Sequence, residues 1–314
     1  MAGDIAQLNQ IIRDDLDSNV LLIKQISEYI ISSGGKRIRP ILVLLCGRIA
    51  GYTDGILLHK MAAMIEYIHT ATLLHDDVVD ESGMRRGYKT SNAVFGNAAS
   101  VLVGDFIYTR SFQMMVQSNS LRLLSVMANS TNKISEGEVM QLLNIGRYDL
   151  TETEYFSVIE SKTAVLFEAS AIVASITANT SVPVETNLAQ YAKYLGIAFQ
   201  IVDDILDYTG DATTMGKNIG DDLLEGKVTL PLIYILQHGS LNDQDLVKNA
   251  IMNPNNSNML EIIEIVNKSN AINYCSKTAR DYIKQANILL DIFPPSQYKT
   301  AMCDLANMAV QRIS

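Results

Sequence analysis

Two clusters of aspartates carry the strongest chemical signal in this sequence. Each has the spacing DDxxD, which places side chains three and four residues apart on one face of a helix. The clusters comprise Asp76, Asp77 and Asp80 in the first and Asp203, Asp204 and Asp207 in the second. Charge runs of this kind are usually solvated faces, and one DDxxD alone is a weak indication of a metal site.

Apolar residues surround both clusters, as in HTATLLHDDVVD and GIAFQIVDDILDY. Carboxylates on largely buried helices need cationic partners, because an unpaired charge is costly to bury. Hard divalent cations, above all Mg2+, prefer such oxygen ligands. Two clusters on buried helices therefore predict a site for several Mg2+ ions, and a clamp of several metal ions suits a diphosphate group.

A basic turn adds a second feature of an anion site. Gly34 and Gly35 end one helical pattern, and Lys36, Arg37 and Arg39 follow just where another helix can begin. The N–H groups and dipole at a helix N-terminus would assist these cations in binding an anion. Alone, the turn could be an exposed basic loop, but beside two predicted metal sites it favours a diphosphate.

Other polar residues could contact phosphate, although a lone histidine is more often a core residue and a lone lysine a surface one. They are His69 two turns before Asp76, Arg85 and Arg86 after the first cluster, Lys162 in SKTA, and Lys217 and Lys227 in a Gly-rich loop at 209–231.

The elements that must position these residues read as helices almost throughout. Apolar residues recur every three to four positions over residues 3–15, 18–33, 55–79, 90–117, 120–145 and 151–178, and shorter helices follow over 232–314. No stretch alternates as a strand would. The sequence therefore predicts an all-α protein, and 314 residues allow one large helical domain.

Composition narrows the classes of function. The net charge of −9 argues against nucleic acid as a partner. The three cysteines are scattered and form neither a disulfide framework nor a zinc motif, which indicates reduced thiols in the cytoplasm. We expect no transmembrane segment, because no apolar run approaches ~18–20 residues.

Five motifs in order give the sequence a family resemblance. They are GGKRIRP (34–40), LLHDDVVDESGMRRG (73–87), SKTA (161–164), FQIVDDILD (199–207) and GKNIGDDLLEGKVTLPL (216–232). Together they resemble the trans-type isoprenyl diphosphate synthases, and within that family the bacterial octaprenyl diphosphate synthases, which make quinone side chains. The resemblance implies one domain over 1–314, a bundle of long helices around a deep central cavity, and a cytoplasmic homodimer.

The resemblance also implies the reaction. Isopentenyl diphosphate would add repeatedly to an allylic diphosphate such as farnesyl diphosphate, with Mg2+ as cofactor and trans double bonds in the product. Octaprenyl diphosphate is the expected product, and product delivery leaves room for a transient membrane contact. One departure from the family pattern is Asn218, where many members have proline, which puts the stiffness of that loop in doubt.

Roles follow residue by residue from the resemblance. It implies that the principal metal ligands are Asp76, Asp80 and Asp203, and that the supporting ligands are Asp77, Asp204 and Asp207. It implies that the allylic diphosphate is bound by Arg85, Lys162, Lys217 and Lys227, and that isopentenyl diphosphate is bound by Lys36, Arg39, His69 and Arg86. Polar groups near the reacting carbons would be those of Thr163 and Gln200. It assigns no role to Arg37.

Product length would depend on the cavity beneath Asp76. Ala71 and Thr72 are small, whereas short-product members tend to carry bulky aromatic residues at these positions, so the tunnel should stay open. Tyr67, Met64, Met115 and Met127 are candidates for its floor, although each could equally be an ordinary core residue.

Other interpretations remain at this point. Synthases of C15–C20 or C35/C45 products differ by small changes at the cavity floor. A class I terpene cyclase would share the fold and metal chemistry but would not need the GGKRIRP site. A non-catalytic subunit of a heteromeric synthase tends to lose the acidic clusters, which are intact here.

Overall fold

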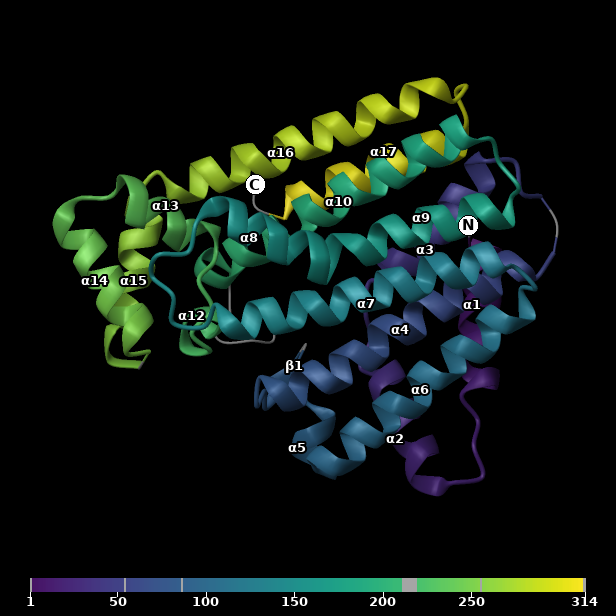
Figure 1. The fold of residues 1–314 in the computed structure, drawn as a ribbon, viewed down its shortest axis with the longest axis horizontal. Helices are drawn as coiled ribbons and strands as arrows, with labels where there is room; N and C mark the ends of the chain where they lie inside the picture. Colours follow the sequence, from purple (N-terminus) through teal and green to yellow (C-terminus); the bar gives the residue numbers. More distant parts are fainter. Residues whose placement is uncertain (1, 54, 86, 211–218, 255, 313–314) are drawn as a thin grey trace. The chain divides into compact units, whose positions relative to one another are not determined.

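The computed structural model describes residues 2–53, 55–85, 87–210, 219–254 and 256–312. Arg86, Lys217 and Asn218 lie outside the described residues. Helices make up nearly all of the described chain (Figure 1), and the predicted all-α class is confirmed. The exception is a short antiparallel hairpin, in which β1 (Met84–Arg85) pairs with β2 (Tyr88–Lys89).

The chain divides into two compact units. The first comprises Met1–Asn129, Ala169–Ala189 and Phe293–Lys299, and the second comprises Ser130–Glu168, Gln190–Ile292 and Thr300–Ser314. The prediction of a single domain over 1–314 stays a prediction.

The first unit contains α1 (Ala2–Asp15), α2 (Leu21–Ser32), α3 (Ile38–Ile49), α4 (Leu57–Val79), α5 (Ser91–Phe95) and α6 (Asn97–Gln117), together with the hairpin. Helix α4 packs against α6, α3 and α1, and Figure 1 shows α4 and α6 side by side. Its apolar side chains, such as Met61, Ile65 and Ile68, are fully buried. The first acidic cluster therefore lies at the C-terminal end of a helix that is packed on several sides by α6, α3 and α1.

The sequence predicted one helix over 90–117, but the structure has two. Helix α5 ends at Phe95, and Gly96 follows with a φ of 86° before α6 begins. Glycine adopts this left-handed region without steric cost, so it can interrupt a pattern of apolar residues that would otherwise continue the helix.

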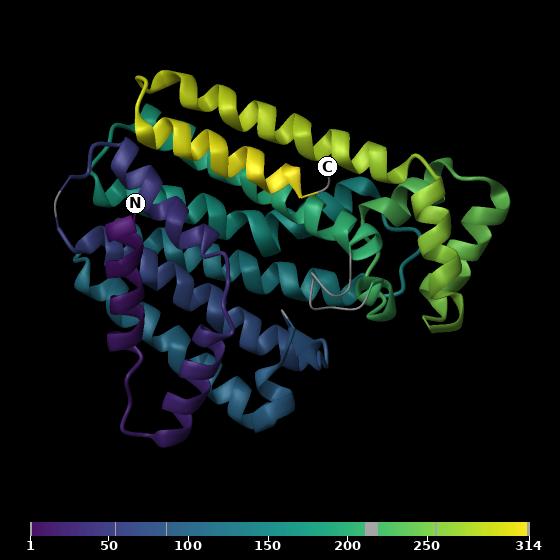
Figure 2. The same ribbon diagram turned by 180° about the vertical axis from the view of Figure 1, so that it is seen from behind.

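The second unit contains α8 (Glu152–Ile159), the π-helical turn η1 (Glu160–Ala164), α12 (Asp221–Leu224), α13 (Leu230–His238), α14 (Leu241–Met252), α15 (Asn256–Lys268), α16 (Ala271–Leu289) and the 3-10 turn η2 (Leu290–Ile292). Four helices contain residues of both units: α7 (Leu121–Leu143), α9 (Val165–Thr177), α10 (Val182–Thr209) and α17 (Gln297–Gln311). Helix α16 lies alongside α17, in the yellow part of Figure 2.

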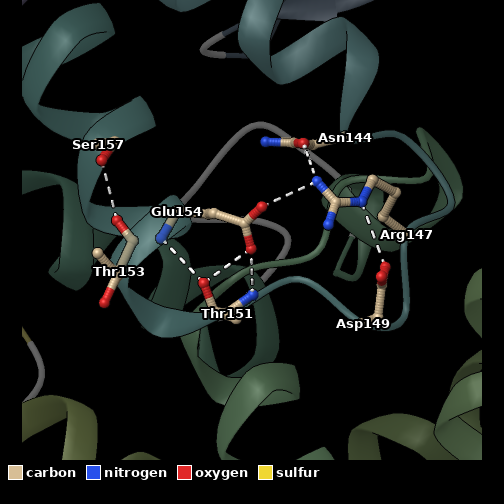
Figure 3. A network of polar contacts seen from close by, with 7 residues as sticks. All are labelled: Asn144, Arg147, Asp149, Thr151, Thr153, Glu154 and Ser157. Carbon is tan, nitrogen blue, oxygen red and sulfur yellow. Dashed lines mark hydrogen bonds and ion pairs between the residues drawn. The ribbon is translucent and has the colours of Figure 1, made fainter.

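A polar network fixes the start of α8 (Figure 3). The Thr151 hydroxyl accepts a hydrogen bond from the Glu154 backbone N–H, and the Glu154 carboxylate accepts one from the Thr151 N–H at 2.9 Å, which is a capping box. Arg147 also donates to Glu154 at 3.1 Å and to Asp149 at 3.2 Å. The hydrogen bonds that Glu154 accepts from Thr151 and Arg147 lower the pKa of its carboxyl group to about 2. The helix that leads to Lys162 therefore begins at a fixed residue.

Among the described residues, no helix combines the length and apolar character needed to cross a membrane.

Candidate functional site

The first acidic cluster lies at the C-terminal end of α4. Asp76 and Asp80 are partly exposed, whereas Asp77 is buried with only 1% exposure. Arg85 of β1 donates to Asp77 Oδ1 through both Nε, at 2.8 Å, and Nη2, at 2.6 Å. The Asp80 N–H donates to the Asp76 carbonyl at 2.8 Å and so continues the helical turn. The cluster thus divides into two accessible carboxylates and one buried carboxylate bound to arginine.

The basic turn contacts α4 at His69, two turns before Asp76. Arg39 Nη1 lies 3.2 Å from His69 Nε2. Because a guanidinium has only donors, a hydrogen bond between the two side chains requires Nε2 of His69 to act as the acceptor. Lys36 is exposed. The structure therefore brings together Arg39 and His69, two of the residues predicted to bind isopentenyl diphosphate.

The residues predicted to set product length differ in burial. Ala71, Tyr67, Met115 and Met127 are all buried at 1% exposure or less, while Thr72 is partly exposed. Tyr67 donates its hydroxyl to the Ile12 carbonyl at 3.1 Å, and burial raises the pKa of Tyr67. The small side chain of Ala71 is fully buried, so a phenylalanine there would extend well beyond the volume that the alanine occupies.

The second acidic cluster, on α10, also contains both kinds of carboxylate, but here one is accessible and two are buried. The Asp203 side chain is 46% exposed, and Nη1 of Arg312, which directly follows α17, lies 3.4 Å from its Oδ1. Asp204 and Asp207 are 2% and 3% exposed. Asp207 Oδ2 accepts from the Asp222 N–H at 3.3 Å, which attaches the start of α12 to α10. Each cluster thus contains at least one accessible and at least one buried carboxylate.

A chain of hydrogen bonds connects Asp204 to the SKTA motif. Thr163 donates to Gln200 Oε1 at 2.8 Å, and Gln200 Nε2 donates to Asp204 Oδ1 at 2.8 Å. Tyr155 of α8 donates to the other carboxylate oxygen of Asp204 at 2.6 Å. Burial and the charge of Asp222 raise the pKa of Asp204, while the hydrogen bonds from Tyr155 and Gln200 oppose that change. Both ends of the Gln200 amide are therefore fixed in orientation.

Lys162 lies in the π-helical turn η1. Its Nζ donates to Glu138 Oε2 at 2.6 Å and to Gln141 Oε1 at 2.7 Å, both on α7. A Cβ added at Gly137 of α7 would lie 2.8 Å from the Lys162 nitrogen, and one at Gly196 of α10 would lie 2.8 Å from the Ala164 Cα. The absence of side chains at these two glycines lets both helices approach the turn closely.

Lys227 follows α12 and donates to Glu225 Oε2 at 2.6 Å. Its own N–H donates to the Asp222 carbonyl at 2.8 Å. The described part of the predicted loop is therefore fixed to the second acidic cluster through Asp222 and Asp207. Sequence reasoning missed Tyr155, Glu138 and Gln141, because each sits in an ordinary helical pattern without a distinctive spacing.

Within the described ranges, no group of three or more His, Cys, Asp or Glu side chains is placed to hold a metal ion by itself. Mg2+ is usually held by one or two carboxylates together with substrate phosphates rather than by an all-protein cage. The partly exposed carboxylates Asp76, Asp80 and Asp203 have the donor chemistry and the accessibility that such an ion requires.

Comparison with known proteins identifies the family. The family model described as "Polyprenyl synthetase" matches residues 20–268. This chain belongs to the polyprenyl synthetase family. It is 49% identical to the octaprenyl diphosphate synthase of Escherichia coli (strain K12) over 312 residues, which covers 99% of this chain and 96% of that protein. The all-trans-nonaprenyl-diphosphate synthase of Rhodobacter capsulatus is 44% identical, covering 100% and 96%.

A solved structure agrees with the family assignment. The polyprenyl synthase from Caulobacter crescentus CB15, complexed with calcium and isoprenyl diphosphate, matches with a TM-score of 0.96 and 38% identity over 100% of this chain and 96% of that one. The predicted enzyme class, a trans-polyprenyl diphosphate synthase, is confirmed. Polyprenyl synthases of this family depend on divalent metal ions.

Proposed function

We propose that this enzyme is a Mg2+-dependent octaprenyl diphosphate synthase that extends farnesyl diphosphate with isopentenyl diphosphate. The observation that carries the product assignment is the 49% identity, over nearly the whole chain, to an octaprenyl diphosphate synthase. The 44% identity to a nonaprenyl-diphosphate synthase makes the C45 product the main alternative.

The division within each acidic cluster supports the proposed metal ligands. Asp76, Asp80 and Asp203 are accessible to an ion that also binds a diphosphate, and these are the positions that the family resemblance assigns to principal ligands. Asp77, Asp204 and Asp207 are buried and act as supports from behind. Bound Mg2+ would neutralise the charge that grows on the leaving diphosphate.

The cations of the chain hold the two substrates. Arg85, Lys162 and Lys227 bind the allylic diphosphate. Before the substrate binds, ion pairs with Asp77, Glu138 and Glu225, respectively, hold these side chains in place. The allylic C–O bond breaks as this diphosphate leaves, and the double bond of isopentenyl diphosphate attacks the resulting carbocation. The released diphosphate takes the proton that is then lost. Gln200 and Thr163 present polar groups whose direction is fixed by the chain to Asp204.

Product length follows from small or flexible side chains beneath the first cluster. Ala71 leaves the space below Asp76 open, and Met115 and Met127 limit the growing chain farther down. Each added isoprene unit buries about five carbons, which is worth roughly 3–4 kcal/mol at ~0.8 kcal/mol per methylene. A long product therefore leaves slowly, and its release limits turnover.

The homodimer, the cytoplasmic location and a transient membrane contact for product delivery belong to the same proposal. Exposed apolar side chains on α6 and α7 support a dimer, since Leu102, Val116 and Leu121 are 67%, 66% and 85% exposed. The three cysteines are free thiols, which suits a reducing compartment. Sedimentation analysis of the purified protein tests the dimer, and a monomer at working concentration would contradict it.

The test of the function is product length by mass spectrometry. The purified protein is incubated with farnesyl diphosphate, excess isopentenyl diphosphate and Mg2+, with a parallel reaction without metal. A C40 product that depends on Mg2+ is expected. A C35 or C45 product would overturn the octaprenyl assignment, and a C15–C20 product would also contradict the open tunnel. No elongation would favour the non-catalytic subunit.

A further inference from the structure

Arg37 is the one cation of the basic turn without a predicted role, and its conformation is unusual. It precedes α3 with φ 50° and ψ 34°, in the left-handed region, although residues at this position of a helix are typically extended. A non-glycine residue adopts this region only when its surroundings hold it there. Its carbonyl accepts the first helical hydrogen bond of α3, from the Ile41 N–H at 3.0 Å.

The side chain of Arg37 supplies the contacts that could hold this conformation. Its Nη1 forms an ion pair with Glu66 Oε1 on α4, and its Nη2 donates to the Ile31 carbonyl at 3.4 Å. The two paired side chains are 17% and 9% exposed. The guanidinium is therefore largely buried and engaged by a carboxylate on α4.

Glu66 precedes His69 by three residues, so the two lie one turn apart on the same side of α4. Arg37 contacts Glu66, and Arg39 contacts His69 at 3.2 Å. Arg37 and Arg39, which are two residues apart in the basic turn, therefore contact successive turns of α4. Lys36 directly precedes Arg37, so the backbone conformation of Arg37 affects where Lys36 lies.

We propose that Arg37 and Glu66 form a positioning pair that sets the shape of the turn for binding isopentenyl diphosphate. The inference rests on the proposed function, which assigns Lys36, Arg39 and His69 to that substrate. Loss of the pair lets the backbone of Arg37 relax toward the extended conformation and displaces Lys36 and Arg39. At metal sites, groups that orient the ligating side chains typically change affinity or activity by about tenfold to a hundredfold when they are removed, and displacements of about 1 Å in an active site have effects of similar size.

A second ion pair on the same helix provides a matched control. Arg48, near the C-terminal end of α3, donates to Asp4 of α1 at 2.6 Å, and these side chains are 16% and 12% exposed. The two pairs are similar in chemistry and in burial, but Arg48 is remote in sequence from the basic turn. A role in stability alone predicts the same kinetic result for both pairs.

The experiment compares Glu66→Gln and Arg37→Lys with Asp4→Asn in steady-state assays. We expect the first two variants to raise KM for isopentenyl diphosphate about tenfold or more, with kcat and KM for farnesyl diphosphate within about twofold. Asp4→Asn should leave all three parameters unchanged. Equal effects on both substrates, or an unchanged KM for isopentenyl diphosphate, would overturn the proposal.

Direct binding covers the case in which a variant is too unstable to assay. Arg37→Lys keeps the charge and loses only the forked geometry, and calorimetric titration with isopentenyl diphosphate alone measures its affinity without turnover. Weakened binding by a folded variant supports the positioning pair, and unchanged binding contradicts it. If the unaltered protein binds isopentenyl diphosphate but elongates nothing, the proposed function fails while the pair remains testable by binding.

Discussion

Replacing Tyr155 by phenylalanine tests whether the hydrogen-bond chain behind Gln200 contributes to turnover. The substitution removes a single oxygen atom and keeps the ring, which packs edge-on against Phe156 at a centroid distance of 5.4 Å. Asp204 Oδ2 then loses a donor that lies 2.6 Å away in a fully buried site. The change therefore isolates one contact of the chain.

The size of the effect follows from the kind of hydrogen bond that is lost. Removing the tyrosine hydroxyl leaves a buried oxygen of Asp204 without its donor, which costs about 1–3 kcal/mol, so the free energy of unfolding should fall by about that amount. If the orientation of Gln200 in the transition state depends on Asp204, a loss of the same size lowers kcat by about tenfold to a hundredfold, at 1.36 kcal/mol per tenfold. KM for both substrates should change little, because no diphosphate contact is removed.

The assay measures urea unfolding and steady-state kinetics for Tyr155→Phe and for Tyr274→Phe as a control. Tyr274 also donates to a carboxylate, at 2.8 and 2.9 Å from the two oxygens of Glu152, but it is more exposed and has no described contact with Gln200. We expect Tyr274→Phe to keep normal kcat. A Tyr155→Phe protein with the expected loss of stability and an unchanged kcat would refute the reasoning, since the chain would then be purely structural.

Three further outcomes are expected. Asp76→Ala and Asp203→Ala should each lower turnover by roughly a thousandfold or more at saturating Mg2+, because each removes an accessible ligand; near-normal activity in the elongation assay would contradict the assignment. Ala71→Phe should shorten the product to three or four isoprene units, because the ring would fill the proposed tunnel, and an unchanged C40 product in mass spectrometry would contradict the tunnel. The pKa of Glu154 falls from 4.5 to about 2 on folding, so its carboxylate stabilises the protein above pH 4.5 and this contribution is lost as the pH falls toward 2. Glu154→Gln should therefore be less stable at pH 6 and show a weaker decline in urea stability between pH 4.5 and 2.5, and identical slopes would argue against the capping role.

The helices and the chemistry of the site were predictable because they depend on local patterns. Apolar spacing located α4 and α10, and DDxxD spacing within them identified the carboxylates. What the spacing could not show is which carboxylates are buried. Asp77 turns toward Arg85 and Asp204 toward Tyr155, and both contacts depend on packing between elements that are distant in sequence.

The interruptions of the helices were the least predictable part of the fold. Residues 151–178 read as one apolar helix, but the structure contains the π-helical turn η1 between α8 and α9. A single added residue leaves the apolar pattern nearly intact, so periodicity does not reveal it. The carboxylate of Glu66 was missed for a similar reason, since one charged residue in an apolar helix has no distinctive spacing, and only its partner Arg37 indicates its importance.

The π-helical turn also determines how this segment tolerates insertion and deletion. Tyr155 and Thr163 are eight residues apart, which in a regular helix of 3.6 residues per turn would place them about 80° apart around the axis. A π-turn holds about one residue more than an α-turn, so one turn of each accommodates about eight residues and returns both side chains to the same face. That face meets Asp204 and Gln200 of α10. Deleting one residue within 160–164 would restore a regular helix in which the two side chains are seven residues and about 20° apart, so both would stay on that face, whereas inserting a further residue would turn them away from each other.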